Sequence, residues 1–380
     1  MTLSAKLLAW FDKNQRPLPW RQHYRPYDVW ISEIMLQQTQ MNTVLPYYER
    51  WMKQFPDVRT LADSDLKKVL KAWEGLGYYS RARNLHPTAL EIVRKHDGIF
   101  PSDFQTIHDF KGIGRYTAGA ISSIAFNQEM PIVDGNILRV LSRVYAIKAP
   151  IDIEKNKPLF WELEEKLIPK GKARYFNQAL MELGALICST ENPSCAICPI
   201  RPFCQAYKNG DPENYPVRSK KVKSIKITAA ALVLKNKGKY LLRLRPLGEI
   251  MGGLWEFPEW KLSKNKKLSL SLIQKRLLKL VGDDYGIHAT SLEPLGVIKR
   301  NYTYFNEILH VYLHPATGGT GGEASAARSE ELHEDRRSPA GDRPRSSQHL
   351  WIHSNKFSEY PFSSAHAKIV KLISEPRRTK

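Results

Sequence analysis

Apolar residues recur at helical spacing through roughly the first 210 positions of the chain. The pattern is clearest in AISSIAF (120–126), NILRVLSRVYAI (136–147) and FNQALMELGALIC (176–188). Short breaks that carry Pro, Gly or Asp separate these runs, as expected at the ends of helices. The pattern predicts that the first part of the protein is mostly α-helical.

The hydrophobic period changes after a basic connector, SKKVKSIK (219–226). ITAAALVLK (227–235) and KYLLRLR (239–245) flank Asn236-Lys237-Gly238, which predicts a β-hairpin. Further strands are expected in GLWEFPEW (253–260), PLGVIKR (294–300), ILHVYLH (308–314) and LWIHSNKF (350–357), with helices in LSLSLIQKRLLKLV (268–281) and AHAKIVKLI (365–373). The second part is therefore expected to be an α+β domain.

One segment of the second part does not fit this pattern. Residues 316–349 contain no Lys in a Lys-rich chain, are rich in Gly, Ala, Ser and Arg, and have almost no large apolar residues. Such a composition cannot bury enough apolar surface to fold. We expect a disordered insertion or a sequence error, with a functional polar loop as the alternative.

The charge of the chain adds a class of partner. Lys and Arg total 58 against 38 Asp and Glu, a formal net charge of +20 over 380 residues, and such a surface attracts polyanions, of which nucleic acid is the commonest. No run is apolar and long enough to cross a membrane, and charge comes too early at the N-terminus for a signal peptide. We expect a protein of the bacterial cytoplasm or nucleoid whose thiols are reduced.

All the cysteines lie in one short window. Cys188, Cys195, Cys198 and Cys204 have the spacing C-x6-C-x2-C-x5-C. A reducing compartment argues against disulfides, and C-x2-C is a metal-ligand spacing. Structural zinc and a 4Fe-4S cluster both take four thiolates, so the spacing leaves both open.

FKGIGRYTAGAISSIAF (110–126) has the order of a helix–hairpin–helix motif. We expect Gly112 and Gly114 to allow positive φ, so that backbone amides point outward at the start of the next helix. Such amides bind phosphate, and Lys111 and Arg115 would add positive charge. The alternative is an ordinary tight turn between helices.

Two acidic residues have contrasting surroundings. Glu33 lies among apolar neighbours in DVWISEIMLQQTQ (28–40), a predicted helix capped by Asp28, and a buried carboxyl there would have a raised pKa. Asp134 precedes a helix whose N-terminus would keep a carboxylate ionised. Such a pair suits cleavage through an oxocarbenium-like state. The alternatives are an exposed helical Glu and a plain N-cap.

Aromatic and basic residues gather in GLGYYSRARN (75–84). Tyr78 and Tyr79 are suited to enter a base stack, and Arg81 and Arg83 to hold phosphates. The alternative is a helix start that is capped by Tyr and has a solvated Arg face.

Taken together, these motifs resemble the MutY-type adenine DNA glycosylases. LPWR (18–21), SEIMLQQTQ (32–40), the hairpin, VDGNILRVL (133–141) and the cysteine spacing occur in the same order in that family. The resemblance is dense over 1–215 and loose over 225–315. It implies a mostly α helix–hairpin–helix glycosylase domain with an iron–sulfur cluster loop, followed by an α+β Nudix-like sandwich domain. It also implies a 4Fe-4S cluster at the four cysteines.

The resemblance implies removal of adenine that is mispaired with 8-oxoguanine or guanine, after the adenine has been flipped out of the duplex. Glu33 matches the acid that protonates adenine N7, and Asp134 the carboxylate that stabilises the oxocarbenium. Tyr116 occupies the position of the lyase lysine of endonuclease III-like enzymes, so a monofunctional enzyme is expected. Four further positions match supporting roles: Asn136 and Glu182 in the active site, Arg21 in the adenine pocket, and Gln38 with Tyr78 beside the damaged guanine.

The second domain resembles the Nudix-like domain with which this family senses 8-oxoguanine. GGLWEFPEW (252–260) lies at the expected position, but no REUxEExGU glutamate box follows, which argues against a Mg-dependent hydrolase. Where the family often has Phe-Ser-His, this chain has Tyr302-Thr303-Tyr304. Thr303 and Tyr304 are the expected contacts to the lesion.

The expected organisation is a glycosylase domain at 1–215, a basic linker at 216–227 and the Nudix-like domain at 228–373. Within the first domain, a barrel segment at about 25–130 is inserted in a cluster segment of 1–24 plus 131–215. We expect a monomer that binds duplex DNA and no membrane. An endonuclease III-like glycosylase for oxidised pyrimidines and a non-catalytic DNA-binding protein are the alternatives.

Overall fold

The computed structural model describes residues 1–219, 224–287, 289–302, 304–314 and 348–374. The insertion predicted at 316–349 lies outside them apart from its last two residues. Contacts divide the chain into two compact units, Met1–Ser64 with Asn84–Lys221, and Asp65–Arg83 with Val222–Lys380. The two units are described separately.

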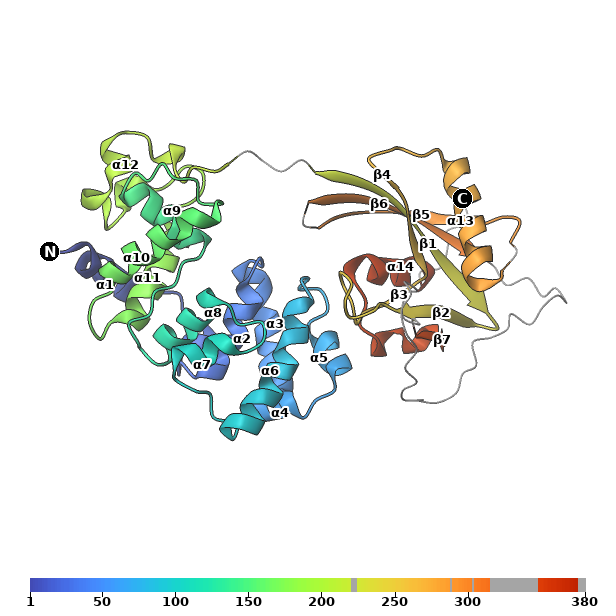
Figure 1. The fold of residues 1–380 in the computed structure, drawn as a ribbon, viewed down its shortest axis with the longest axis horizontal. Helices are drawn as coiled ribbons and strands as arrows, with labels where there is room; N and C mark the ends of the chain where they lie inside the picture. Colours follow the sequence, from blue (N-terminus) through green and yellow to red (C-terminus); the bar gives the residue numbers. More distant parts are fainter. Residues whose placement is uncertain (220–223, 288, 303, 315–347, 375–380) are drawn as a thin grey trace. The chain divides into compact units, whose positions relative to one another are not determined.

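The first unit is helical, which confirms the prediction for this part of the chain (Figure 1). Its main helices are α1 (Leu3–Asn14), α2 (Pro26–Leu36), α3 (Met41–Gln54), α4 (Val58–Ala62), α6 (Ser80–His96, whose first turn is in the second unit), α7 (Phe104–Asp109), α8 (Arg115–Ala120), α9 (Gly135–Val144), α10 (Lys157–Leu167), α11 (Ala173–Leu186) and α12 (Gln205–Lys208). Side-chain caps begin several of them, for example Asp103 accepting from the Thr106 amide. The cap predicted for α2 is wrong, because Asp28 lies inside the helix and pairs with Arg25 at 2.9 Å.

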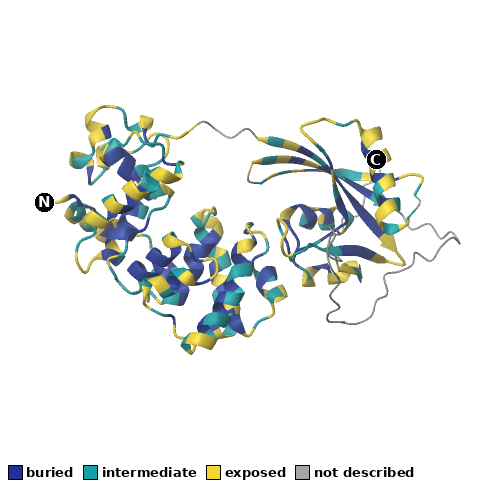
Figure 2. Ribbon diagram, in the orientation of Figure 1, coloured by how far each residue is buried: buried dark blue, intermediate teal, exposed yellow. Residues whose placement is uncertain are grey.

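Helix α11 packs against α1, α9 and Ile121–Ala125, and most of its residues are buried. Buried residues of the helices are dark blue in Figure 2. Phe176, Leu180 and Leu183 recur at helical spacing and are at most 1% exposed. α1 packs on one part of α11 through its own buried residues, and α9 packs on another. The apolar residues whose helical spacing predicted these helices therefore form the surface through which the helices pack together.

The predicted hairpin joins α7 to α8. Gly112 has φ +80°, which a side chain would oppose, and a Cβ there would come within 2.5 Å of the Asn84 side chain. The expectation of positive φ at Gly114 is wrong, because Gly114 is the extended N-cap of α8 with φ −88°. After α8, residues Ile121–Ala125 form a π-helix, and Arg174 donates hydrogen bonds to the Ile124 and Ala125 carbonyls.

In the part of the chain that the structure describes, the second unit contains a mixed seven-stranded sheet. Its strands are β1 (Ile225–Asn236), β2 (Lys239–Leu244), β3 (Trp255–Glu256), β4 (Glu259–Lys264), β5 (Glu293–Tyr302), β6 (Phe305–His314) and β7 (His349–His353). β1 pairs parallel with β6 and antiparallel with β4 and β2. The predicted hairpin between β1 and β2 is confirmed, with Lys237 and Gly238 both at positive φ. β1 begins at Ile225, inside the predicted linker.

Two helices, α13 (Leu270–Tyr285) and α14 (Ser364–Ser374), cover opposite faces of this sheet (Figure 1). Alternate residues of β1 serve the two faces, with Ala229 and Ala231 on the α14 side and Ala230 and Leu232 on the α13 side. Because β1 is buried on both faces, it reads as a continuous apolar run.

The second unit also includes residues 65–83, which precede the sheet by more than a hundred residues. Here α5 (Leu66–Ala72) leads into the GLGYYSRARN segment. The Tyr79 hydroxyl donates to the Phe362 carbonyl at 3.2 Å, and the Phe362 amide donates to Glu74 at 2.9 Å. Arg83 donates to the Gly252 carbonyl at 2.6 Å. Through these bonds, segment 65–83 is part of the second unit.

In the described part of the chain, no helix is long and apolar enough to cross a membrane.

The sheet core gives a stability prediction. Leu309→Ala, at a fully buried position of β6, should lower the free energy of unfolding of the second unit by about 2–5 kcal/mol, because it leaves a cavity. Ile308→Ala is the matched control, since Ile308 is the neighbouring residue on the same strand and is 41% exposed. Urea denaturation followed by tryptophan fluorescence measures both. Equal losses for the two variants would contradict the core assignment.

Candidate active site

A cavity of about 430 Å³ opens between α2, α8, α9, α11 and the segment before α2. Seven of the site residues predicted from the sequence line it: Arg21, Glu33, Gln38, Tyr116, Asp134, Asn136 and Glu182. They come from positions as far apart as 21 and 182, so the fold brings together residues that the sequence shows only as separate motifs.

Glu33 is buried in the wall of this cavity, with 4% exposure. Burial raises the pKa of Glu33 to about 7, against the opposing effect of a hydrogen bond from the Tyr116 hydroxyl. That bond joins the Tyr116 oxygen to Glu33 Oε2 at 2.6 Å. The buried environment expected from the apolar neighbours is confirmed. A carboxyl with this pKa can give up a proton near neutral pH.

Asp134 is the N-cap of α9, as predicted. Its Oδ1 accepts from the Ile137 amide at 2.7 Å, and its Oδ2 accepts from Asn136 Nδ2 at 2.9 Å. Burial nevertheless raises the pKa of Asp134 above its usual range, while the bonds from Ile137 and Asn136 oppose the rise. The effect expected from the helix N-terminus is therefore present but is outweighed by desolvation.

Glu182 is held as an anion by two arginines. Arg16 binds it through Nε at 2.6 Å and Nη2 at 2.9 Å, and Arg21 donates from Nη2 at 3.0 Å. Although burial acts in the other direction, hydrogen bonds from Arg16 and the charge of Arg21 lower the pKa of Glu182. Arg21 also donates to Gln178 at 2.8 Å. One wall of the cavity is thus a fixed set of polar groups.

The sequence analysis missed Arg16, Gln178 and Met181, which all line the cavity. Gln178 and Met181 lie on α11, within one turn of Glu182. The helical spacing of FNQALMEL was the signal that could have found them. Arg16 precedes α2 in an irregular segment, and nothing in the local pattern marks it.

Among the residues predicted to bind DNA, Gln38 joins Arg21 and Glu182 in lining this cavity. Lys111, Gly112, Gly114 and Arg115 are exposed on the hairpin of the first unit. In the second unit, Tyr78 is 52% exposed with φ +46° and Tyr304 is 46% exposed. Thr303 lies outside the described residues.

Two arginines expected to hold phosphates have internal partners instead. Arg81 is 9% exposed and donates to the Leu76 and Gly77 carbonyls, both at 3.2 Å. Arg83 donates to the Gly252 carbonyl. Both therefore stabilise the conformation of the segment that carries Tyr78.

The four cysteines line a second cavity. They are reduced and half-buried, and Val140, Leu183, Ile187 and Ile200 supply an apolar wall. Burial raises the pKa of the Cys198 thiol to about 11. Four sulfur donors around one apolar space fit a thiolate-ligated metal group.

Two arginines of α9 link the two cavities within the first unit. Arg139 donates to Asn136 Oδ1 at 2.8 Å and to the Cys188 carbonyl at 2.7 Å. Arg143 donates to Cys188 Sγ at 3.2 Å. The Asn136 side chain, which also binds Asp134, is thereby connected to the cysteine loop. Both arginines went unnoticed in the sequence, where they lie on the polar face of an amphipathic helix.

The pKa of Glu33 gives a prediction about stability. Its folded-state pKa of about 7 lies above its ordinary value of 4.5, so the native state loses stability as pH rises between these values. Glu33→Gln removes that loss, and at pH 8 the variant should be more stable than the parent by up to about 3 kcal/mol. At pH 4 the two should be close.

Thermal unfolding at both pH values measures this difference. Glu162→Gln is the control, because Glu162 is an exposed residue of α10. A Glu33→Gln variant whose stability follows pH as the parent's does would show that Glu33 is ionised normally.

Comparison with known proteins assigns the chain to a family. Residues 31–166 match the HhH-GPD superfamily of base excision DNA repair proteins, and residues 229–372 match the NUDIX domain. The adenine DNA glycosylase of Mus musculus is 34% identical over 362 residues, which cover 82% of this chain and 68% of that protein. The Arabidopsis thaliana adenine DNA glycosylase is 34% identical over 348 residues, 81% of this chain and 54% of the plant protein, so the chain spans about half the length of that relative.

A solved structure supports the assignment of the helical part. The structure of a thermostable thymine-DNA glycosylase is 28% identical, with a TM-score of 0.50, and the match covers 54% of this chain and 95% of that one. The helical fold, the Nudix-like fold and the identity over most of the chain agree with the resemblance that the motifs suggested. The chain belongs to the adenine DNA glycosylase family of base excision repair proteins.

Proposed function

We propose that this protein hydrolyses the N-glycosidic bond of adenine that is mispaired with 8-oxoguanine or guanine in duplex DNA. The observation that carries the proposal is the sharing of one cavity by Glu33, which has a pKa of about 7, and Asp134, which accepts two hydrogen bonds. Acid and anion are the two groups that cleavage through an oxocarbenium-like state requires.

In the first step, Glu33 donates its proton to N7 of the flipped adenine. Protonation makes the base a better leaving group, so the bond from C1′ to N9 breaks and its electron pair leaves with adenine. Tyr116 holds the Glu33 carboxyl in one orientation. The apolar surroundings that keep Glu33 protonated in the free enzyme thus prepare it to act as the acid.

In the second step, Asp134 stabilises the positive charge that develops on the sugar, directly or through a covalent bond to C1′. Asn136 and the Ile137 amide hold its two oxygens in place, so little reorganisation is needed when the charge appears. Water then adds to C1′, where it displaces Asp134 if a covalent bond has formed, gives up its proton to the ionised Glu33, and leaves an abasic site. The structure's cavity-lining residues, all of them described, include no lysine, and Tyr116 cannot form a Schiff base, so we propose a glycosylase without lyase activity.

The remaining predicted residues are proposed to bind the substrate. Arg21 and Glu182 would orient the adenine within the fixed polar wall. Gln38 and Tyr78 would probe the stack beside the damaged guanine, and both have positive φ, a strained backbone conformation that clusters at functional sites. On the hairpin, Lys111, Gly112, Gly114 and Arg115 would hold phosphate, and Thr303 and Tyr304 would contact the lesion.

Cys188, Cys195, Cys198 and Cys204 are proposed to hold a 4Fe-4S cluster. When bound, the cluster would supply four strong cross-links across a loop that has little regular structure. The net charge of +20 supports binding to the DNA backbone, and the protein is proposed to act as a monomer. The barrel segment at about 25–130 and the cluster segment of 1–24 plus 131–215 belong to the same proposal, with a basic linker that ends where β1 begins at Ile225.

The activity is tested by single-turnover cleavage of duplexes with A opposite 8-oxoguanine, G or C, followed by alkali to reveal abasic sites. The parent should cleave A opposite 8-oxoguanine fastest, and Glu33→Gln should lower that rate by at least about 100-fold while DNA binding is retained. Glu162→Gln, on an exposed helix face, should leave the rate unchanged.

The same experiment separates the alternatives. Cleavage of oxidised pyrimidines, with a covalent DNA adduct trapped by borohydride, would support an endonuclease III-like enzyme. Tight binding without loss of any base would support a non-catalytic protein. Either result would overturn the proposed activity.

The metal group is tested by composition and spectroscopy of the purified protein. Iron and acid-labile sulfide should be present in about equal amounts, with visible absorbance, and Cys198→Ser should lose most of both. A colourless protein that contains one zinc ion would contradict the cluster. This result does not depend on an activity assay.

A further inference from the structure

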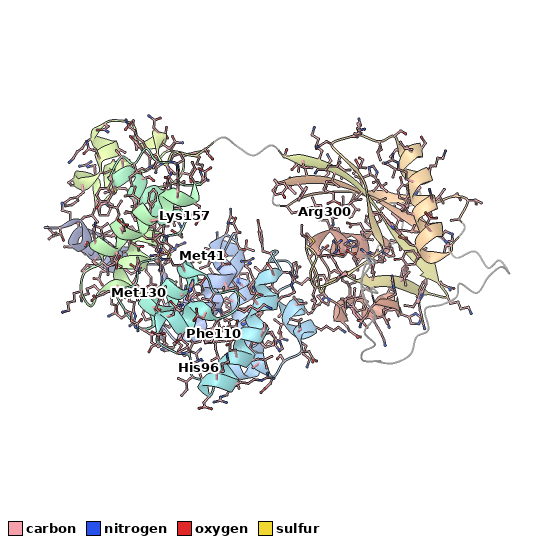
Figure 3. All side chains as sticks on the ribbon, in the orientation of Figure 1. Met41, His96, Phe110, Met130, Lys157 and Arg300 are labelled. Carbon is pink, nitrogen blue, oxygen red and sulfur yellow. The ribbon has the colours of Figure 1, made fainter. Side chains whose placement is uncertain are left out.

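A row of buried charged side chains crosses the sheet of the second unit. Three carboxylates take part, Glu256 on β3, Glu259 on β4 and Glu307 on β6, and they are 2%, 8% and 2% exposed. Three arginines face them, Arg243, Arg245 and Arg300, of which Arg300 is labelled in Figure 3. We call these six residues the charged row.

The pairs within the charged row are direct. Arg243 and Arg245 both bind Glu256, Arg243 through Nε at 3.0 Å and Arg245 through Nε at 2.7 Å. Arg300 Nη2 bridges Glu259 at 2.6 Å and Glu307 at 2.7 Å. Three positive and three negative charges therefore compensate one another away from water, as buried charges require.

His366 of α14 closes the row on the side of the helix. Its Nδ1 accepts from the Phe257 amide at 3.1 Å, so the proton lies on Nε2, which donates to Glu259 Oε2 at 3.0 Å. Donor atoms of Glu256, Glu259 and His366 lie within 4.8 Å of one another, as in a metal site. The paired arginines make a cation unfavourable there, which assigns the group a structural role.

The other end of the row holds Tyr302. The Tyr302 hydroxyl donates to Glu307 Oε2 at 2.5 Å, while Glu307 Oε1 accepts from Arg300. Tyr302 is the last residue of β5 and pairs in register with Phe305, the first residue of β6. A hydrogen bond to a charged, buried acceptor is stronger than one between neutral groups. Glu307 thus fixes the side chain at the end of this hairpin.

Contacts between aromatic rings connect the fixed Tyr302 side chain to Tyr304, which lies between β5 and β6 at the tip of this hairpin. The Tyr302 and Phe305 ring centroids are 5.4 Å apart, and those of Phe305 and Tyr304 are 4.4 Å apart. Tyr304 is 46% exposed, so it is available to a ligand. The chain of contacts runs from the buried Glu307 through two rings to an exposed one.

We infer that Glu307 is a positioning residue for opposite-base recognition, which acts by fixing the Tyr302 hydroxyl and hence the tip that carries Tyr304. The inference rests on the proposed function, which places this tip at 8-oxoguanine. A tip held before binding loses less conformational entropy when DNA arrives, so its contacts contribute more to discrimination. Tyr302 is then an anchor, and the exposed residue beside it makes the contact.

The test compares two single-turnover rates, for A opposite 8-oxoguanine and for A opposite G, and uses their ratio. Tyr302→Phe deletes only the hydroxyl, and Glu307→Gln removes the charge of its acceptor. Each should lower the ratio by about fivefold, and the double variant should lower it no further than the single variant with the larger effect does, because both remove one interaction. A purely structural defect would reduce the active fraction for both substrates equally and leave the ratio unchanged.

Asp283→Asn is the control, since Asp283 is an exposed carboxylate of α13 outside the row, and it should leave the ratio as in the parent. Unchanged ratios in Tyr302→Phe and Glu307→Gln, or effects that multiply in the double variant, would overturn the inference. If Glu307→Gln fails to fold, Tyr302→Phe alone decides between these outcomes. A parent that removes adenine at equal rates opposite both bases would also overturn it, whereas a parent that removes no adenine would contradict the proposed function itself.

Discussion

Desolvation of charge is the constraint on which the rest of this structure depends. Burial of Glu33 among the surrounding helices excludes water from its carboxyl, and exclusion of water destabilises the ionised form and raises the pKa to about 7. The same medium strengthens the bonds that keep Glu182 and Asp134 in place. The pKa values of the carboxyls in this one cavity therefore differ: that of Glu182, which two arginines bind, is lowered, whereas those of Glu33 and Asp134 are raised by burial.

Much of the fold could be predicted because it follows from local periodicity. The stripe on α11 and the continuous apolar run of β1 each bury the residues that made them visible in the sequence. The site was predictable to the extent that its residues lie in such elements, as Glu33 and Asp134 do. Arg16 was not, because its partner Glu182 is 166 positions away and no local pattern encodes that pairing.

Errors in the sequence analysis came from tertiary context that outweighed local rules. Asp28 is a good capping residue, but Pro26 begins the helix two residues earlier and leaves Asp28 inside it. The N-terminus of α9 does favour an anion at Asp134, yet burial has the larger effect on the pKa. In the hairpin, Gly112 alone makes the left-handed turn, since Gly114 already has the extended conformation of a cap.

The inclusion of residues 65–83 in the second unit changes what counts as a module of this protein. In the sequence, the glycosylase part ends before the basic connector, so a truncated glycosylase domain would naturally end there. In the structure, however, Glu74, Tyr79 and Arg83 form hydrogen bonds with Phe362 and Gly252, and such a truncation removes both of these partners. A shortened protein would expose these polar groups to water on the very segment that carries Tyr78. The two parts of the sequence are thus structurally dependent on each other. The main chain of Phe362 supplies hydrogen bonds to Glu74 and Tyr79, which lie almost three hundred residues earlier in the chain.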